Sequence, residues 1–558
     1  MNDLLNYVVF FGVLLLAAWP LSRLILWVYN GVAKKANPVE AALYKVSGIA
    51  FEKEMDWKQW AGALMILSLV KIAAVFVILV FQNYLPLNPQ NLPGVPWDLA
   101  LNTAVSFTTN TNWQNYGGES TMSYFSQMAA LSLQNFLSAA AGIAVLFALV
   151  RGVVRRETKH LGNFWVDLVR INLYLLLPVS LVSALVLISQ GAIQNLLPYV
   201  QATGLAGGAQ TLPMGPLASQ EAIKMLGTNG GGFFNANSAH PWENPTAFTN
   251  FFESILVFLI PTSLVFTFGR AAKDMRQSWA IFGIMAVLFT AFFLASLAAE
   301  TAPLPHAAAL GVDGSAGNLE GKETRFGVGP TVLFNDVTTA TSCGAVDGMI
   351  DSYTPLGGMV PLVLIQVGEV IFGGVGSGLY GMIAMLMLTV FVGGLMVGRT
   401  PEYLGKKIES FDMKMIVVAV MITPFVVLTG TAVACLWHWV PSDLGNGGAH
   451  GFSEVFYAFS SMANNNGSAF AGLNGNTHFW NVVGALAMFV GRFGVMIPIL
   501  ALAGNLAQKK AAIPSLGTLP THGLTFAALV VFFIIVVAAL NFVPGLALGP
   551  LAEFFQAS

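Results

Sequence analysis

The stretch Ala463–Phe470, ANNNGSAF, decides the fold of this chain because it is polar where its surroundings are apolar. Three consecutive asparagines and a glycine stand between two long hydrophobic runs. Asparagine side chains are costly in hydrocarbon unless they find hydrogen-bond partners. Irregular polar backbone survives at membrane depth only where protein buries it or where it lines a water-filled path. The stretch therefore predicts a buried, pore-lining loop.

The composition is that of an integral membrane protein. Of the 558 residues, 56% are hydrophobic and only 9% are charged, whereas soluble proteins carry about a quarter charged residues. Two cysteines, Cys343 and Cys435, are too few for a disulfide framework or a cysteine-rich metal site. The net charge of -2 and the lack of a basic domain argue against a nucleic-acid partner. The seven histidines show no metal-ligand spacing.

Apolar segments long enough to cross a bilayer recur along the whole chain. A spanning helix needs about 20 apolar residues, and candidates begin near Leu4, Trp60, Gln127, Trp165, Thr249, Trp279, Val360, Met413, Phe479 and Leu524. We therefore predict an all-α membrane protein with about ten transmembrane helices. The first segment lacks a positive leading region and is longer than a signal-peptide core, so we expect it to be a retained span.

The positive residues set the predicted orientation. Taking the loops alternately, one side holds 18 of the 25 lysines and arginines: Lys34, Lys35, Lys45, Lys53, Lys58, Arg151, Arg155, Arg156, Lys159, Arg270, Lys273, Arg276, Arg399, Lys406, Lys407, Lys414, Lys509 and Lys510. The other side holds Lys224, Lys322 and Arg325, and the spans hold Arg23, Lys71, Arg170 and Arg492. Because cytoplasmic loops attract Lys and Arg, we expect the rich side to be cytoplasmic and both termini to lie outside.

Four long outer connections, at about 86–122, 191–248, 300–358 and 438–478, contain similar polar quartets. The quartets are TNTN (Thr109, Asn110, Thr111, Asn112), GTNG (Gly227, Thr228, Asn229, Gly230), TSCG (Thr341, Ser342, Cys343, Gly344) and NNNG (Asn464, Asn465, Asn466, Gly467). Each follows a short amphipathic stretch: WDLALNTAVSFT, SQEAIKML, VLFNDVTTA and FSEVFYAFSSMA. Their similar spacing predicts a repeated module of helix, re-entrant loop and helix. The first quartet departs from the others because it ends in Asn112 instead of glycine, so we expect its place in the ring to be the least symmetric.

Four such loops around one axis predict a cation filter. Each half-helix would aim its partly negative C-terminal end at the centre, and the following carbonyl oxygens could replace the water around an ion. Glycine and asparagine tolerate the left-handed backbone of such a turn. We expect Asn and Thr side chains to brace this carbonyl cage, although direct ligation by their amides stays open. Because the quartets lack carboxylates, we expect potassium first and sodium second, ahead of calcium or magnesium.

A glycine-rich segment lies within the apolar stretch from Val360 to Gly398. It reads GEVIFGGVGSGLYG, and glycine weakens helices. We predict two half-helices and an irregular loop beneath the third quartet, which would form a gate with Gly368, Glu369, Gly373, Gly374, Gly376 and Gly378. The alternative is close helix packing through small residues.

A second intramembrane charge accompanies Glu369. Arg492 lies in the span containing FVGRFGVMIP, and charges within spans usually pair or line a pathway. We expect Glu369 and Arg492 to lie near each other beneath the filter, where Arg492 would discourage cations from passing straight to the cytoplasm. A purely structural pair, or separate snorkelling of the two side chains, is the alternative.

Several motifs resemble those of one known family. They are TTNTNWQNYGGE, MLGTNGGGFFNANSAHP, TSCGAV, QVGEVIFGGVGSGLYGM, VGRTPEYLGKK, ANNNGSAFAG and GTLPTHG. Together they resemble the potassium-binding A subunit of the bacterial Kdp complex, a potassium-transporting P-type ATPase of the inner membrane, within the superfamily of potassium transporters. The resemblance covers essentially the whole chain.

The resemblance implies an architecture and a set of partners. It implies four helix–pore loop–helix repeats with one extra helix at each end, here 1–59, 60–160, 161–275, 276–410, 411–510 and 511–558. It also implies that the potassium-binding subunit takes potassium ions from the periplasm and passes them sideways toward the ATP-hydrolysing B subunit, a P-type ATPase. The C subunit and a small single-span subunit would complete the complex. The chain has no DKTG or Walker A motif, so we expect a non-catalytic subunit with no organic cofactor.

Three other functions compete with this expectation. A stand-alone potassium permease of the same superfamily is the nearest alternative. A polytopic enzyme acting on lipids would need a clustered acid, base or metal set, whereas the conspicuous clusters are amides, hydroxyls and glycines. GSGLYG, at 376–381, has the spacing of a dinucleotide fingerprint, but no strand–turn–helix pattern surrounds it.

Overall fold

The computed structural model describes residues 2–32, 37–303, 311, 313–396, 398–437, 440–510 and 519–557. Lys34 and Lys35 of the predicted cytoplasmic charges lie outside the described residues, as do residues 517 and 518 of the GTLPTHG motif and residue 397 of VGRTPEYLGKK.

Ten helices in the described part of the chain are long and apolar enough to cross a membrane. They are α1 (Asn2–Tyr29), α3 (Trp57–Val80), α6 (Leu133–Val154, after a π-helical turn Ser126–Ser132), α7 and α8 (Phe164–Ile171 and Leu177–Ser189, joined by the π-helical Asn172–Leu176), α10 (Ala247–Ala272), α11 (Met275–Thr301), α15 (Ser377–Met396), α16 (Ser410–Leu436), α18 (His478–Gln508) and α19 (Leu524–Leu548). The predicted fold class and the predicted number of spans are confirmed.

Burial separates the central helices from the outer ones. Most of the apolar windows of α6 and α10 is buried, whereas less than a quarter of that of α19 is. A helix that is apolar on all sides suits both situations, since lipid and protein interior are similarly apolar. The centre of the bundle therefore lies around α6 and α10, and α19 offers its surface to lipid or a partner.

Four shorter helices lie between spanning helices. They are α4 (Trp97–Thr108), α9 (Leu217–Leu226), α13 (Val328–Ala340) and α17 (Gly448–Ala463), with 10 to 16 residues each. At 1.5 Å per residue none can cross a core about 30 Å thick. Each contains one of the amphipathic stretches quoted above, and each stops at the residue before a polar quartet. We call them the pore helices, and the quartets after them the filter loops.

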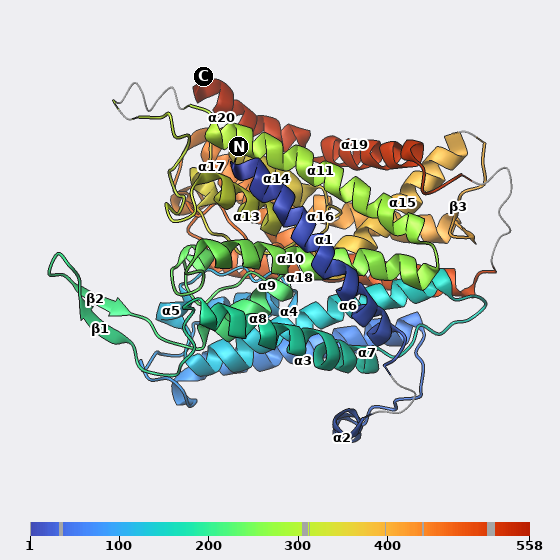
Figure 1. The fold of residues 1–558 in the computed structure, drawn as a ribbon, viewed down its shortest axis with the longest axis horizontal. Helices are drawn as coiled ribbons and strands as arrows, with labels where there is room; N and C mark the ends of the chain where they lie inside the picture. The colour runs from blue at the N-terminus through green and yellow to red at the C-terminus, as the bar shows by residue number, and fades with distance from the viewer. Residues whose placement is uncertain are drawn as a thin grey trace.

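The elements outside the spans gather at the two ends of the bundle (Figure 1). Both described chain ends lie at the end that carries the β1–β2 hairpin (Val200–Thr203 and Ala209–Leu212). The opposite end carries α2 (Pro38–Ser47) and the β3–β4 hairpin (Glu402–Tyr403 and Lys406–Lys407). Two further short helices are α5 (Gly118–Thr121) and α20 (Pro550–Ala557). Neither hairpin was predicted.

The span expected near Val360 is broken. Helix α14 (Pro355–Gln366) ends early, residues 367–376 are irregular, and α15 begins at Ser377. The prediction of two half-helices with a loop between them is confirmed. GSGLYG therefore begins at the last residue of this loop and continues into α15. No strand precedes it in this described segment, so it lacks the strand–turn–helix unit of a dinucleotide-binding site.

Two arginines near the end with α2 are paired within the protein. Arg151 donates to Asp167 with an Nη2–Oδ1 distance of 2.9 Å, and Arg170 donates to Glu40 with an Nε–Oε1 distance of 2.8 Å. All four side chains are buried, and removing one partner of a buried pair leaves a costly unpaired charge. These pairs fasten α2 and α7 to the bundle.

Candidate functional site

All four filter loops share one backbone conformation. The second residue of each has left-handed φ: 68° at Asn110, 48° at Thr228, 57° at Ser342 and 55° at Asn465. Left-handed backbone is uncommon for non-glycine residues and costs about 1–3 kcal/mol. Because it ends each pore helix at the same place, the sequence repeat reflects a true structural repeat. Such strained residues cluster at functional sites.

A repeated hydrogen bond turns the amide of each third residue back toward its pore helix. The N–H donates to the carbonyl five residues earlier, at N–O distances of 3.0 Å (Thr111 to Ser106), 2.9 Å (Asn229 to Lys224), 3.0 Å (Cys343 to Thr338) and 2.8 Å (Asn466 to Ser461). These bonds hold the third N–H of each loop on the side of its pore helix. Each loop is thereby folded back on the end of that helix.

Hydrogen bonds join the four loops in a closed ring. In order round the ring, they run from Asn110 Nδ2 to the Thr228 carbonyl (3.0 Å), from the Gly344 N–H to the Asn229 carbonyl (3.2 Å), from Ser342 Oγ to the Asn465 carbonyl (2.6 Å) and from Asn465 Nδ2 to Thr111 Oγ1 (2.9 Å). Every loop is therefore tied to both of its neighbours. The sequence quartets are brought together at one site.

The three consecutive asparagines all act as donors in this ring or behind it. Asn464 donates to the Ser460 carbonyl at 2.9 Å. Asn465 donates to Thr111 and, at 2.9 Å, to the Met488 carbonyl, while Asn466 donates weakly to the Thr338 and Thr339 carbonyls at 3.4 Å. All three are buried. Their amide groups brace the backbone, as expected from the sequence.

The fourth residues stand where the loops come closest together. A Cβ on Gly230 would lie 2.1 Å from Gly344 N, one on Gly344 would lie 2.8 Å from Gly467 C, and one on Gly467 would lie 2.0 Å from Thr111 O. Gly230 and Gly467 also have φ of 101° and 100°. Steric exclusion requires glycine at all three positions. Left-handed backbone is a second reason for glycine at Gly230 and Gly467.

Asn112 takes this position in the first loop, with φ of 56°. Its side chain turns toward Gly231, whose added Cβ would lie 2.9 Å from Asn112 Oδ1. Both polar atoms of the Asn112 side chain are buried and have no hydrogen-bond partner in the described part of the chain. All four fourth residues line one cavity of about 310 Å³, together with residues that follow the loops in the sequence, such as Asn115, Asn235 and Ala471. We call it the outer cavity.

The irregular segment 367–376 lies beneath the filter loops. The Gly373 N–H donates to the Ala340 carbonyl at 3.1 Å, and the Val375 N–H donates to Thr228 Oγ1 at 3.1 Å. Glu369 and Phe372 have left-handed φ of 58° and 62°. The Phe372 ring stacks on Phe258 of α10 with 4.3 Å between ring centroids. The segment is therefore held by the second loop, by the end of the third pore helix and by aromatic packing at its side.

The glycines of this segment allow close backbone approach. A Cβ on Gly376 would lie 2.2 Å from the Gly142 carbonyl oxygen of α6, and one on Gly378 would lie 1.8 Å from the Phe372 carbonyl oxygen. Gly373 and Gly374 are equally confined, whereas an added Cβ on Gly368 meets nothing within 4 Å. The segment from Gly368 to Gly378 therefore combines both features considered from the sequence: an irregular loop, and close packing through small residues.

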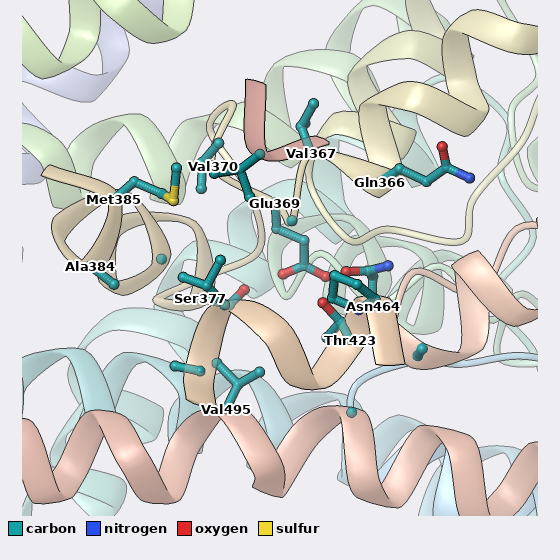
Figure 2. A pocket seen from close by; sticks show the side chains of 18 of the residues that line it. Gln366, Val367, Glu369, Val370, Ser377, Ala384, Met385, Thr423, Asn464 and Val495 are labelled. Atoms are coloured by element: carbon teal, nitrogen blue, oxygen red, sulfur yellow. The ribbon is translucent and has the colours of Figure 1, made fainter. Parts of the chain in front are cut away.

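A cavity of about 80 Å³ lies between this segment and the fourth filter loop. Glu369, Arg492, Asn464 and Asn465 all line it, and Figure 2 shows the Glu369 carboxylate extending toward Asn464. Glu369 Oε1 is buried and has no hydrogen-bond partner among the residues that the structure describes. Glu369 and Arg492 share this cavity, but they form no ion pair among the described residues.

Lys224 is a structural residue of the filter that the sequence placed only in an outer loop. Its ammonium is buried in α9 and lies 2.6 Å from Glu221, 2.9 Å from Glu243 and 2.9 Å from Asn237 Oδ1. Asn237 Nδ2 donates in turn to the Gly230 carbonyl at 2.7 Å. The position of Lys224, three residues before a quartet, was the only hint of this role in the sequence. Its partners Asn237 and Glu243 lie beyond the quartet, so the sequence did not identify them.

A second polar group was also missed. His450 lies between Asp351 and Glu553, with Nε2–Oδ1 and Nδ1–Oε1 distances of 3.0 and 2.9 Å. Asp351, His450 and Glu454 lie close enough together to hold a metal ion. The spacing of histidines along the sequence could not indicate this group, because Asp351 is distant from His450 in the sequence. Glu454 already accepts hydrogen bonds from Asn446. The carboxylates of Asp351 and Glu553 form hydrogen bonds with the two ring nitrogens of His450, so both nitrogens already have partners within the protein.

Comparisons with known proteins give a consistent result. A family model described as potassium-transporting ATPase A subunit (KdpA) matches residues 8–555. A potassium-transporting ATPase potassium-binding subunit of Escherichia coli O81 (strain ED1a) is 56% identical over 548 residues, covering 98% of each chain. The same kind of protein from Escherichia coli O45:K1 (strain S88 / ExPEC) is 58% identical over 518 residues, covering 93% of each.

A solved structure has a similar fold. It is the crystal structure of the potassium transporter TrkH from Vibrio parahaemolyticus, with a TM-score of 0.51, 13% identity, and coverage of 89% of this chain and 97% of that one. At this identity the likeness concerns the fold alone.

Proposed function

Because this chain belongs to the family of the potassium-transporting ATPase A subunit, we propose that it is the potassium-binding and translocating component of an ATP-driven potassium uptake complex. The single observation that carries the proposal is the closed ring of four filter loops, which hydrogen bonds join at each of its four junctions. Such a ring can replace the hydration shell of a dehydrated alkali ion with carbonyl oxygens. We place the ion among the quartets 109–112, 227–230, 341–344 and 464–467.

The chemistry of the ring favours potassium. The quartets contain no carboxylate, whereas calcium and magnesium sites usually recruit Asp or Glu. The pore helices also direct the partly negative ends of their dipoles toward the loops, which favours a cation. The ion is the transported substrate of this protein, and we propose no organic cofactor.

We propose four repeats, with boundaries 60–160, 161–275, 276–410 and 411–510, flanked by extra segments 1–59 and 511–558. The end with the outer cavity would face the periplasm and the end with α2 would face the cytoplasm. This orientation agrees with the positive-inside rule. It places both termini outside a bacterial inner membrane.

The pathway below the filter would be lateral. The segment 367–376 would obstruct the axis, because Val375 holds it to the second loop and Gly373 holds it to the end of the third pore helix. Glu369 would attract the ion as it leaves the filter, and Arg492 would repel it from the straight route to the cytoplasm. We expect a separate B subunit, a P-type ATPase, to hydrolyse ATP and to receive the ion. The C subunit and a small single-span subunit would belong to the same complex.

The test is reconstitution of the complete complex in proteoliposomes. We expect potassium-stimulated ATP hydrolysis and ATP-dependent uptake of labelled rubidium, both lost when the companion subunits are omitted. Uptake by the lone chain without ATP would favour a stand-alone potassium permease, the nearest alternative from the sequence. In Arg492→Met we expect ion binding to persist while hydrolysis loses its dependence on potassium; normal coupling would remove Arg492 from the gate.

A further inference from the structure

Lys71 is a buried cation in the middle of α3. Its side chain is almost fully buried, at 4% exposure, and no carboxylate lies within ion-pair distance of it among the described residues. Ionisable residues inside the membrane are costly and usually face a partner or a pathway. Lys71 therefore needs an explanation that the surrounding apolar packing does not supply.

The Lys71 ammonium lies at the C-terminal end of the first pore helix. Its Nζ is 3.5 Å from the carbonyl oxygen of Thr108, the last residue of α4. A helix C-terminus carries roughly half a negative charge, so Lys71 offsets the attraction that α4 would exert on an ion. Among the described residues, no other lysine donates to the last carbonyl of a pore helix: Lys224 in the last turn of α9 bonds Asn237 and Glu243, and the last carbonyl of α13, that of Ala340, accepts the Gly373 N–H.

A second cation belongs to the neighbouring helix α18. Arg492 lies in α18, which packs against both α3 and α4. The Arg492 guanidinium also approaches α6, with Nη2 3.3 Å from the position of a Gly142 Cβ. The two cations thus lie where the first and fourth modules meet, whereas Glu369 belongs to the segment that follows α14.

We propose that Lys71 is a pathway residue: a fixed positive charge that makes the field beneath the filter asymmetric. It repels a dehydrated ion from the side of the first pore helix, where its Nζ lies 3.5 Å from the Thr108 carbonyl oxygen. The ion is thereby directed toward Glu369 and the cavity beneath the fourth loop. This inference rests on the proposed function, because it assumes that a potassium ion occupies the filter.

A purely structural role makes a different prediction. If Lys71 only filled space with its long stem, methionine would replace it with little functional effect. If its charge acts on the ion, Lys71→Met relieves the cost of burying an unpaired ammonium and should stabilise the fold, while it weakens the barrier. Higher stability combined with poorer function is a signature that a packing role does not produce.

The experiment uses the complete complex in proteoliposomes, with Lys71→Met, Lys71→Arg and the control Ser68→Ala. Ser68 lies one turn away in α3, is buried, and bonds only the Leu64 carbonyl of its own helix. We measure rubidium leak without ATP, rubidium uptake per ATP hydrolysed, and thermal stability. For Lys71→Met we expect a leak increased about tenfold, as loss of one buried charge interaction would give, with an unchanged or higher Tm. Lys71→Arg and Ser68→Ala should behave as wild type.

A wild-type leak and wild-type coupling in Lys71→Met would overturn the proposal, as would an equal defect in Ser68→Ala. A lower Tm in Lys71→Met would assign Lys71 to packing. Failure of the wild-type complex to respond to potassium would instead contradict the proposed function itself. The two failures are therefore distinguishable.

Discussion

Asn465 closes the filter ring by donating from Nδ2 to the hydroxyl of Thr111, at 2.9 Å. The two residues are 354 positions apart in the sequence, and the bond joins the last filter loop to the first. Without it the ring would be tied at three places only. The bond therefore links the two ends of the fourfold arrangement at the centre of the protein.

Replacing Asn465 with alanine should weaken ion binding. The change removes the donors to Thr111 and to the Met488 carbonyl, and each lost buried hydrogen bond costs about 1 kcal/mol. We expect the half-saturating potassium concentration for ATP hydrolysis by the complex to rise about tenfold. Asn172→Ala is the matched control, because Asn172 Nδ2 bonds only the Leu168 carbonyl within its own span. An unchanged potassium dependence in Asn465→Ala would argue against bracing.

Gly230→Ala should disrupt the ring by steric conflict. Its Cβ would lie 2.1 Å from Gly344 N, and its φ of 101° disfavours any side chain. We expect potassium affinity in the complex to fall at least about tenfold and selectivity over sodium to decline, because the loops must move apart. Potassium-stimulated hydrolysis in the presence of sodium measures both effects.

Gly62→Ala provides the control for this substitution. Gly62 lies in α3 with nothing within 4 Å of an added Cβ, so alanine should be neutral or slightly stabilising. If Gly230→Ala bound potassium as tightly as Gly62→Ala, the close contact between the second and third loops would have no functional importance.

Lys224→Met should destabilise the protein. It leaves Glu221 and Glu243 buried without their ammonium partner, and breaking such a group costs about 3–5 kcal/mol. We expect a clear fall in the Tm of the complex. The double variant Lys224→Met, Glu243→Gln should recover part of the loss, because it removes one of the unpaired charges. A double variant no more stable than Lys224→Met would show that the two groups are not coupled.

The His450 group predicts a pH dependence at the outer end of the bundle. Hydrogen bonds to Asp351, the larger cause, and to Glu553 raise the pKa of the His450 imidazole to about 10 from an ordinary value of 6.5. A raised folded-state pKa stabilises the folded state fully below pH 6.5, and this contribution is lost as pH rises through about 10. His450→Gln should therefore lower Tm at pH 7.

The same variant should lose its effect in alkali. Thermal unfolding of wild type and His450→Gln from pH 6 to pH 10 measures the difference in Tm, which should shrink as pH approaches the raised pKa of about 10. A difference that stays constant over this range would contradict a charged imidazole. Glu553 lies in α20, so loss of the bond should also release this helix to proteolysis.

Local patterns made the fold predictable from the sequence. WDLALNTAVSFT coincides with α4, residues 97–108, because a short amphipathic run followed by polar turn residues ends a helix at a definite place. The break after Gln366 followed similarly from glycine density. The β1–β2 hairpin was missed because its strands have four residues each and carry little periodicity.

The site was predictable only in part, because its positions are local but its partners are distant. The quartets identify the filter residues, since left-handed backbone favours glycine and asparagine. Nothing near Asn465 in the sequence indicates Thr111, and His450 meets Asp351 and Glu553 across 99 and 103 residues. Ion pairs such as that of Lys224 with Glu243 likewise arise only when the modules assemble.

The most direct test of the account is to locate the ion. A high-resolution structure of the complex in potassium, repeated in rubidium, should show density on the axis of the ring, surrounded by backbone oxygens of 109–112, 227–230, 341–344 and 464–467. An empty ring at saturating potassium, with the ion bound elsewhere, would contradict the account.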